Sequence, residues 1–90
     1  NFADISFISC PALHLQHGLS DNNLNEAEVR KHMLENSHYK VLIVDHTKFD
    51  SISDVLFYEL AAVDLLITDQ PLSETWEEYC RKSSIEIIYS

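Results

Sequence analysis

Residues 41–49, Val-Leu-Ile-Val-Asp-His-Thr-Lys-Phe, carry the strongest structural signal in the sequence. Four apolar residues, three of them β-branched, run without interruption and stop at Asp45. A strand without polar alternation is covered on both faces, as in the middle of a parallel α/β sheet. Ligands of such sheets bind just beyond the carboxyl ends of the strands. We therefore expect a binding site in the segment from Asp45 to Phe49.

Composition limits the classes of function that this sequence can serve. A hydrophobic content of 46% over 90 residues allows a packed core in one domain or in part of one. Fifteen acidic residues against six basic ones give a net charge of −9, which would repel a nucleic acid. No apolar run approaches the roughly 20 residues of a membrane span, and no signal peptide opens the chain. We expect no contact with a membrane.

The two cysteines and the first residue of the sequence support two further expectations. Cys10 and Cys80 are far apart and form no CxxC pair, so we expect reduced, packed cysteines in a cytoplasmic protein. The sequence starts without methionine and runs directly into an apolar strand. We expect residues 1–90 to be a fragment of a longer protein.

The pattern along the chain predicts an α/β, Rossmann-like fold, with a mainly parallel sheet flanked by helices. Ser20 to Asn23 offer N-caps for the first helix, and Ser73 can cap a second helix that reaches Arg81 and Lys82. A single helical turn is expected at 60–63. The expected strands are Ile5–Cys10, Val41–Val44, Val55–Tyr58, Leu65–Asp69 and Ile85–Tyr89, and the first helix is expected at Leu24–Ser37.

Apolar spacing predicts which side chains of the helices face the core. In the second helix the inward side chains are Trp76, Tyr79 and Cys80. In the first helix the expected inward stripe is Leu24, Ala27, Val29, Met33 and Leu34.

Gly18 is the only glycine, and it lies in a segment, residues 11–20, that we expect to be a loop. We expect glycine there either because φ is positive or backbone comes close, or because the chain makes a plain tight turn.

Four segments follow the pattern of a known family in the right order. They are FISCPALHLQHGLS at 7–20, NEAEVRKHM at 25–33, DHTKF at 45–49 and LITD at 66–69. Together they resemble the C-terminal sensor domain of the DeoR family of bacterial transcriptional repressors. That family carries an EHGLT-like loop, EAxVKxxM on a helix, DxSKF after a strand and ITD further on. The DHTKF and ITD elements are specific in combination, whereas either alone is weak.

The resemblance implies a fold similar to that of sugar-phosphate isomerases and glucosamine-phosphate deaminase. It implies a domain that senses a phosphorylated sugar or polyol without transforming it. In the family, an N-terminal winged helix-turn-helix binds operator DNA, and the effector changes that affinity. Residues 1–90 would then be the second half of the sensor domain, a partial effector-binding domain, with the winged helix-turn-helix and the first half of the sensor outside the sequence.

The sequence departs from the family pattern near the first strand. Ser9 and Ala12 stand where the family usually has glycine, Pro11 stands where it has an acidic residue, and Gln16 replaces a common glutamate. Side chains at these positions would crowd a ligand that depends on close approach of the backbone. The departures bear on which effector binds and on whether this segment binds it.

Lys48 and Asp45 are the first candidates for ligand binding. The Lys48 ammonium suits a phosphate or a sugar hydroxyl, and its alternative is a solvated lysine or an ion pair with Asp45 or Asp50. Asp45 could accept hydrogen bonds from sugar hydroxyls or orient Lys48, or it could cap the following turn. The remaining candidates are Phe49, the loop of His17 and Gly18, and His46; the two histidines either line the pocket or face water.

Metal binding and catalysis are the alternatives to a sensor. His14 and His17 are three residues apart and His46 follows Asp45, but no set at usual metal-ligand spacing is present, so we expect no metal and no cofactor. An isomerase- or deaminase-like enzyme could use Asp45, His17 and Lys48 for proton transfer. Residues 9–12, where the deaminase has its acidic motif, contain no carboxylate. We expect no enzyme activity.

Association is a third class of function. With half of a sensor domain missing, a sheet edge or a helix face would be uncovered, and exposed edges tend to pair. We therefore expect a homo-oligomer.

Overall fold

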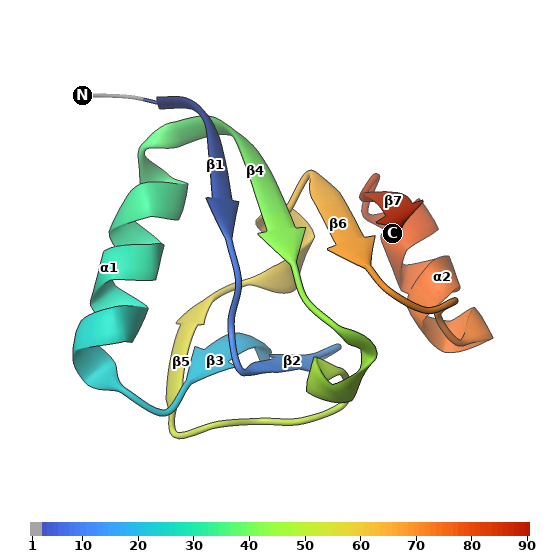
Figure 1. Ribbon diagram of the computed structural model, residues 1–90, viewed down its shortest axis with the longest axis horizontal. Helices are drawn as coiled ribbons and strands as arrows, with labels where there is room; N and C mark the ends of the chain where they lie inside the picture. The colour runs from blue at the N-terminus through green and yellow to red at the C-terminus, as the bar shows by residue number, and fades with distance from the viewer. Residues whose placement is uncertain (1–2) are drawn as a thin grey trace.

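Two β-sheets and two α-helices form residues 3–90, the part of the chain that the computed structural model describes (Figure 1). The larger sheet has four parallel strands in the order β1-β4-β6-β7. The smaller sheet is antiparallel, in the order β2-β3-β5. The strands are β1 (Ala3–Ile8), β2 (Ala12–His14), β3 (Gly18–Asp21), β4 (Ser37–Ile43), β5 (Val55–Tyr58), β6 (Leu65–Thr68) and β7 (Glu86–Tyr89). The helices are α1 (Leu24–Glu35), α2 (Glu74–Lys82) and the short 3₁₀ turns η1 (His46–Lys48) and η2 (Leu60–Ala62).

Strand β4 lies in the interior of the larger sheet, between β1 and β6. Its residues Val41 and Leu42 are buried, which confirms the strand expected from the apolar run. The strand is longer than expected, because it begins at Ser37, where the helix was expected to end. Helix α1 ends at Glu35, two residues earlier, and the backbone N–H of its C-cap residue Asn36 bonds back to the His32 carbonyl oxygen. The expected α/β class with a mainly parallel sheet is confirmed.

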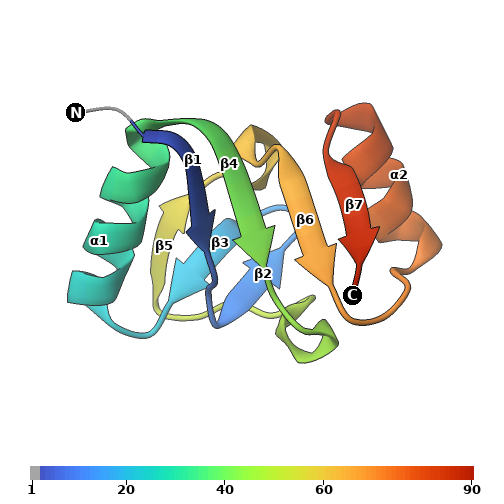
Figure 2. The same ribbon diagram turned by 45° about the horizontal axis from the view of Figure 1, so that its top comes forward.

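One face of the larger sheet carries the core. Figure 2 shows its strands in front of the smaller sheet and α2. Helix α1 packs on the same inner face, because Leu34 and Leu42 share one core cluster. The outer face exposes large apolar side chains: Ile5, Phe7, Tyr39, Ile43 and Ile88. The expectation that β4 is covered on both faces is therefore wrong for Ile43, 43% exposed, because both helices and the smaller sheet pack on the inner face.

Helix α1 buries a narrower stripe than expected. Asn23 caps it, with the side-chain oxygen accepting from the Glu26 N–H at 3.0 Å. Ala27 and Leu34 are buried, as expected. The helix turns by about 100° per residue, so positions seven apart share a face. The other three residues of the expected stripe lie away from that face and are exposed, which corrects the prediction for Leu24, Val29 and Met33.

Helix α2 follows its prediction closely. Ser73 caps it and accepts from the Trp76 N–H at 3.3 Å. Trp76 and Cys80 are buried and Tyr79 packs against the core.

The smaller sheet was not expected, because residues 11–20 read as a loop. Strands β2 and β3 form a hairpin, and β5 joins β3 on the other side. Gly18 has φ +77°, and a Cβ there would collide with the backbone carbonyl oxygen of Tyr58. The positive φ and the close backbone approach expected of the only glycine are both present.

Candidate functional site

The ends of β1 and β4 lie side by side and open onto a cavity of about 410 Å³. Residues 9–11, which follow β1, form one wall, and residues 43–45 at the end of β4 form another. Two cationic side chains complete the lining: Arg30 from α1 and Lys48 from η1. The cavity therefore occupies the position beyond the carboxyl ends of parallel strands where α/β sheets bind ligands.

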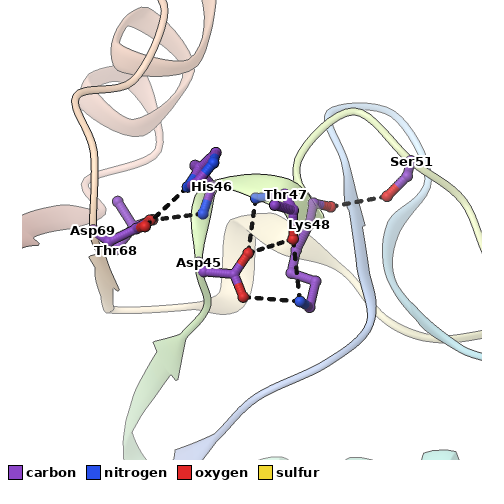
Figure 3. A network of polar contacts seen from close by, with 7 residues as sticks. All are labelled: Asp45, His46, Thr47, Lys48, Ser51, Thr68 and Asp69. Carbon is purple, nitrogen blue, oxygen red and sulfur yellow. Dashed lines mark hydrogen bonds and ion pairs between the residues drawn. The ribbon is translucent and has the colours of Figure 1, made fainter.

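Asp45 organises the turn at the end of β4 (Figure 3). One carboxylate oxygen accepts from the Thr47 N–H at 2.8 Å and from the Thr47 hydroxyl. The other accepts from the Lys48 ammonium, with Nζ 2.9 Å from Oδ2. Two of the three roles considered for Asp45 are thus present: it caps the turn and it orients Lys48. The hydrogen bond from Lys48, followed by those from Thr47, lowers the pKa of Asp45 well below its usual range.

A second aspartate, at the end of the neighbouring strand β6, holds the turn that follows β4. Asp69, directly after β6, accepts from the His46 backbone N–H at 2.7 Å, and its other oxygen lies 2.9 Å from His46 Nδ1 (Figure 3). An ionised carboxylate only accepts, so Nδ1 carries the proton. The hydrogen bond from His46 lowers the pKa of Asp69. His46 therefore joins the ends of β4 and β6 in the structure.

Arg30 is the cavity residue that the sequence analysis missed. Its guanidinium Nη1 bonds Oδ2 of Asp21, the last residue of β3, whose side chain is only 3% exposed. Arg30 also approaches Glu26, with 3.5 Å between Nη1 and Oε2. A signal for it existed in the spacing, since Arg30 lies three residues after Ala27 and four before Leu34. A charged residue between two core positions of a helix needs a partner or a ligand.

The segment that departs from the family pattern borders the cavity only in part. Ser9 and Pro11 line it, whereas Ala12 is buried in strand β2 and is not among the lining residues. Cys10 also lines the cavity, and burial raises the pKa of its thiol to about 11. At neutral pH the Cys10 side chain is therefore a protonated thiol, which is a poor nucleophile.

The other candidate residues lie elsewhere. His17 and Gly18 border a separate cavity of about 440 Å³ with Tyr58 and Glu59, because the β2–β3 hairpin carries them to the β5–η2 connection. Phe49 is half-buried and packs edge-on against Trp76, with 4.8 Å between the ring centroids. The structure thus brings Asp45 and Lys48 together in one cavity and does not bring His17 and Gly18 into it.

Within residues 3–90, no group of three His, Cys, Asp or Glu side chains is placed to hold a metal ion. The rings of His14 and His17 lie 4.9 Å apart, and His14 Nδ1 accepts from the backbone N–H groups of Gln16 and His17. Over the same residues, the helices are all too short or too polar to cross a bilayer.

An α/β domain with a cavity at the ends of its parallel strands, lined by apolar side chains and a few charged ones, has the architecture of a small-molecule-binding domain. The sequence model of the DeoR C-terminal sensor domain matches residues 2–70. The chain belongs to this family of sensor domains of transcriptional regulators.

Characterised relatives agree with that assignment. The HTH-type transcriptional regulator IolR of Bacillus subtilis is 29% identical over 91% of this chain and 33% of its own length. The deoxyribose operon repressor of Escherichia coli is 27% identical over 96% of this chain and 34% of its own length. The HTH-type transcriptional regulator GlpR of Haloferax volcanii is 31% identical, over 94% and 33%. The chain thus spans about a third of the length of these relatives.

Proposed function

We propose that this chain senses a phosphorylated sugar or polyol for a DeoR-type transcriptional repressor. Ligand binding at the cavity between β1 and β4 changes the affinity of an N-terminal winged helix-turn-helix for operator DNA. Residues 1–90 form the second half of the sensor domain, and the full-length protein is a cytoplasmic homo-oligomer. The family assignment and the three transcriptional regulators among its relatives support this function.

The observation that carries the proposal is the pairing of cations and a carboxylate at one cavity. Lys48 and Arg30 offer positive charge to a phosphoryl group, and Asp45 offers acceptors for hydroxyl groups. A volume of about 410 Å³ lies in the range of small-molecule sites, roughly 300–1,000 Å³. A polyhydroxylated ligand with one phosphoryl group matches this distribution of charge.

The ionisation of the cavity groups favours sensing over catalysis. A general base works best when its pKa lies near the operating pH. The hydrogen bonds from Lys48 and Thr47 hold the pKa of Asp45 far below that, and burial keeps Cys10 protonated. Both groups are therefore poorly suited to moving the protons of a sugar phosphate.

The test is release of operator DNA by the full-length protein during titration with a panel of phosphorylated sugars and polyols. We expect one class of these compounds to release the DNA without being consumed. Lys48→Ala should weaken the response to ligand about tenfold, because a charge-assisted hydrogen bond to the ligand is lost. Lys82→Ala removes a lysine from the exposed end of α2 and serves as the charge-matched control.

Two outcomes would contradict the proposal. Turnover of a sugar phosphate into product at a useful rate would assign the domain to the isomerase- or deaminase-like enzymes. An unchanged response in the Lys48→Ala variant would remove Lys48 from the ligand site.

A further inference from the structure

The buried residue Asp21 fixes the position of the Arg30 guanidinium on the side away from the cavity. Asp21 is 2% exposed, and a buried carboxylate is costly unless a cation and hydrogen bonds compensate it. Arg30 Nη1 supplies the cation, and the backbone N–H of Asn23 donates to the other carboxylate oxygen at 3.0 Å. Strand β3 and helix α1 therefore meet at this pair, so Arg30 has little freedom to leave the cavity wall.

Arg30 keeps hydrogen-bond donors for a further partner. A guanidinium has five N–H donors in a planar fork. Both of its polar contacts within residues 3–90, to Asp21 and to Glu26, are made by Nη1. The donors of Nη2 and Nε form the edge of the fork that binds a phosphoryl group with two parallel hydrogen bonds. The Arg30 side chain is 23% exposed and lines the cavity, so a ligand there can reach it.

Lys48 offers a different kind of positive charge at the same cavity. Its ammonium lies 2.9 Å from Asp45 Oδ2 and 3.2 Å from the Thr47 hydroxyl, and both acceptors are exposed, one on the N-cap residue of η1 and one within η1. An exposed pair of this kind is weak, so the ammonium can exchange one acceptor for another at little cost. Arg30 is therefore a fixed, directional donor, and Lys48 is a movable point charge.

We propose that Arg30, held in place by the buried Asp21, binds the phosphoryl group of the ligand, and that Asp45 accepts hydrogen bonds from the hydroxyl groups of the same ligand. This inference rests on the proposed sensor function and adds to it the orientation of the ligand. The phosphoryl group lies toward α1 and the sugar or polyol chain toward η1. Arg30 is then the residue that distinguishes a phosphorylated ligand from its unphosphorylated form.

Calorimetric titration of the full-length protein tests this assignment. The probes are ribose 5-phosphate, deoxyribose 5-phosphate, glucose 6-phosphate and glycerol 3-phosphate, each beside its unphosphorylated form. For whichever phosphate binds the unsubstituted protein, Arg30→Gln should lower the affinity by about 10- to 100-fold, the range for hydrogen bonds to a charged group. The preference for the phosphorylated form should shrink by the same factor. Arg81→Gln, which removes an exposed arginine paired with Glu78 on α2, should change neither quantity.

A second variant separates ligand binding from folding. Arg30→Gln alone leaves the buried Asp21 without its cation and can destabilise the domain. The double variant Asp21→Asn/Arg30→Gln removes the buried charge together with the cation, so the domain should fold while phosphate affinity stays low. Asp21→Asn alone keeps the guanidinium but loosens it, and should reduce phosphate affinity by a smaller factor.

The outcomes distinguish this inference from the function on which it rests. Wild-type affinity in the double variant, combined with weakened binding in Lys48→Ala, would overturn the role of Arg30 and leave the sensor function standing. An equal loss of affinity for phosphorylated and unphosphorylated forms would show that Arg30 acts only through the fold. If the unsubstituted protein binds no probe and releases operator DNA with none, the sensor function and the role of Arg30 are both wrong.

Discussion

Two acid–cation pairs each place their cation in the wall of the same cavity, and they differ in almost every physical respect. Asp21 and Arg30 are nine residues apart, and the pair joins β3 to α1 around a carboxylate that is 3% exposed. Asp45 and Lys48 are three residues apart in one turn, with side chains 48% and 34% exposed. Burial makes the first pair part of the fold, whereas solvent makes the second easy to open. A binding site can thus combine a rigid contact with an adjustable one.

The largest expected effect breaks the buried pair. Arg30→Met leaves Asp21 charged and buried without its cation, and should lower the free energy of unfolding by about 3 kcal/mol. Urea denaturation followed by circular dichroism measures the change. The double variant Asp21→Asn/Arg30→Met should recover most of the loss, because no uncompensated charge remains. A loss smaller than about 1 kcal/mol in the single variant would mean that the pair behaves as an exposed one.

Acid should have an intermediate effect, through the exposed turn. The pKa values of Asp45 and Asp69 are lower in the folded protein than their usual value of 3.8, so the folded state binds fewer protons in acid than the unfolded chain. Their stabilising contribution is complete above the unfolded pKa and is lost as the pH falls through the folded one. The melting temperature should therefore drop between about pH 5 and pH 2.

The matched variant for this pH series is Asp45→Asn, which retains an acceptor for the turn but cannot titrate. Its melting temperature should fall less steeply over the same interval. A slope equal to that of the unsubstituted protein would show that Asp45 does not contribute to the acid dependence.

The smallest expected effect concerns Lys48. Lys48→Ala should lower the melting temperature only slightly while it weakens the response to ligand, because its pair with Asp45 is exposed and local. Thermal unfolding of this variant beside Arg30→Met completes the comparison. A clear loss of stability in Lys48→Ala would remove the proposed distinction between a structural and an adjustable cation.

The sequence could predict the local half of the site and not the non-local half. Asp45 and Lys48 lie within one turn, directly after an apolar run that is typical of a strand, so four consecutive residues contain the whole interaction. The pair of Arg30 with Asp21 depends on β3, a strand of four residues in a segment that reads as a loop. The β2–β3 hairpin and the pairing of β3 with β5 create that strand, and β5 is remote from it in sequence.

The sequence predicts that an apolar segment is a strand or a helix, but it does not show which face of that element other parts of the chain will cover. The apolar run of β4 correctly indicated a strand, but apolar character cannot tell which elements will cover each face. Phe7 and Ile43 are therefore exposed on the outer face, although both belong to strands whose apolar sequence is typical of buried strands. In α1, Val29 and Met33 looked like core residues because they are apolar, yet only the side of Ala27 and Leu34 meets the sheets.

Gly18 has a consequence for the genetics of ligand response. It opens strand β3, and Asp21 closes the same strand, so the hairpin geometry at one end determines where the support for Arg30 lies at the other. Every missense change at this codon adds a Cβ where the Tyr58 carbonyl leaves no room. In a screen for repressors that no longer release their operator, substitutions of Gly18 should therefore be recovered beside substitutions of the residues that line the proposed ligand cavity. This is expected although Gly18 itself borders a different cavity.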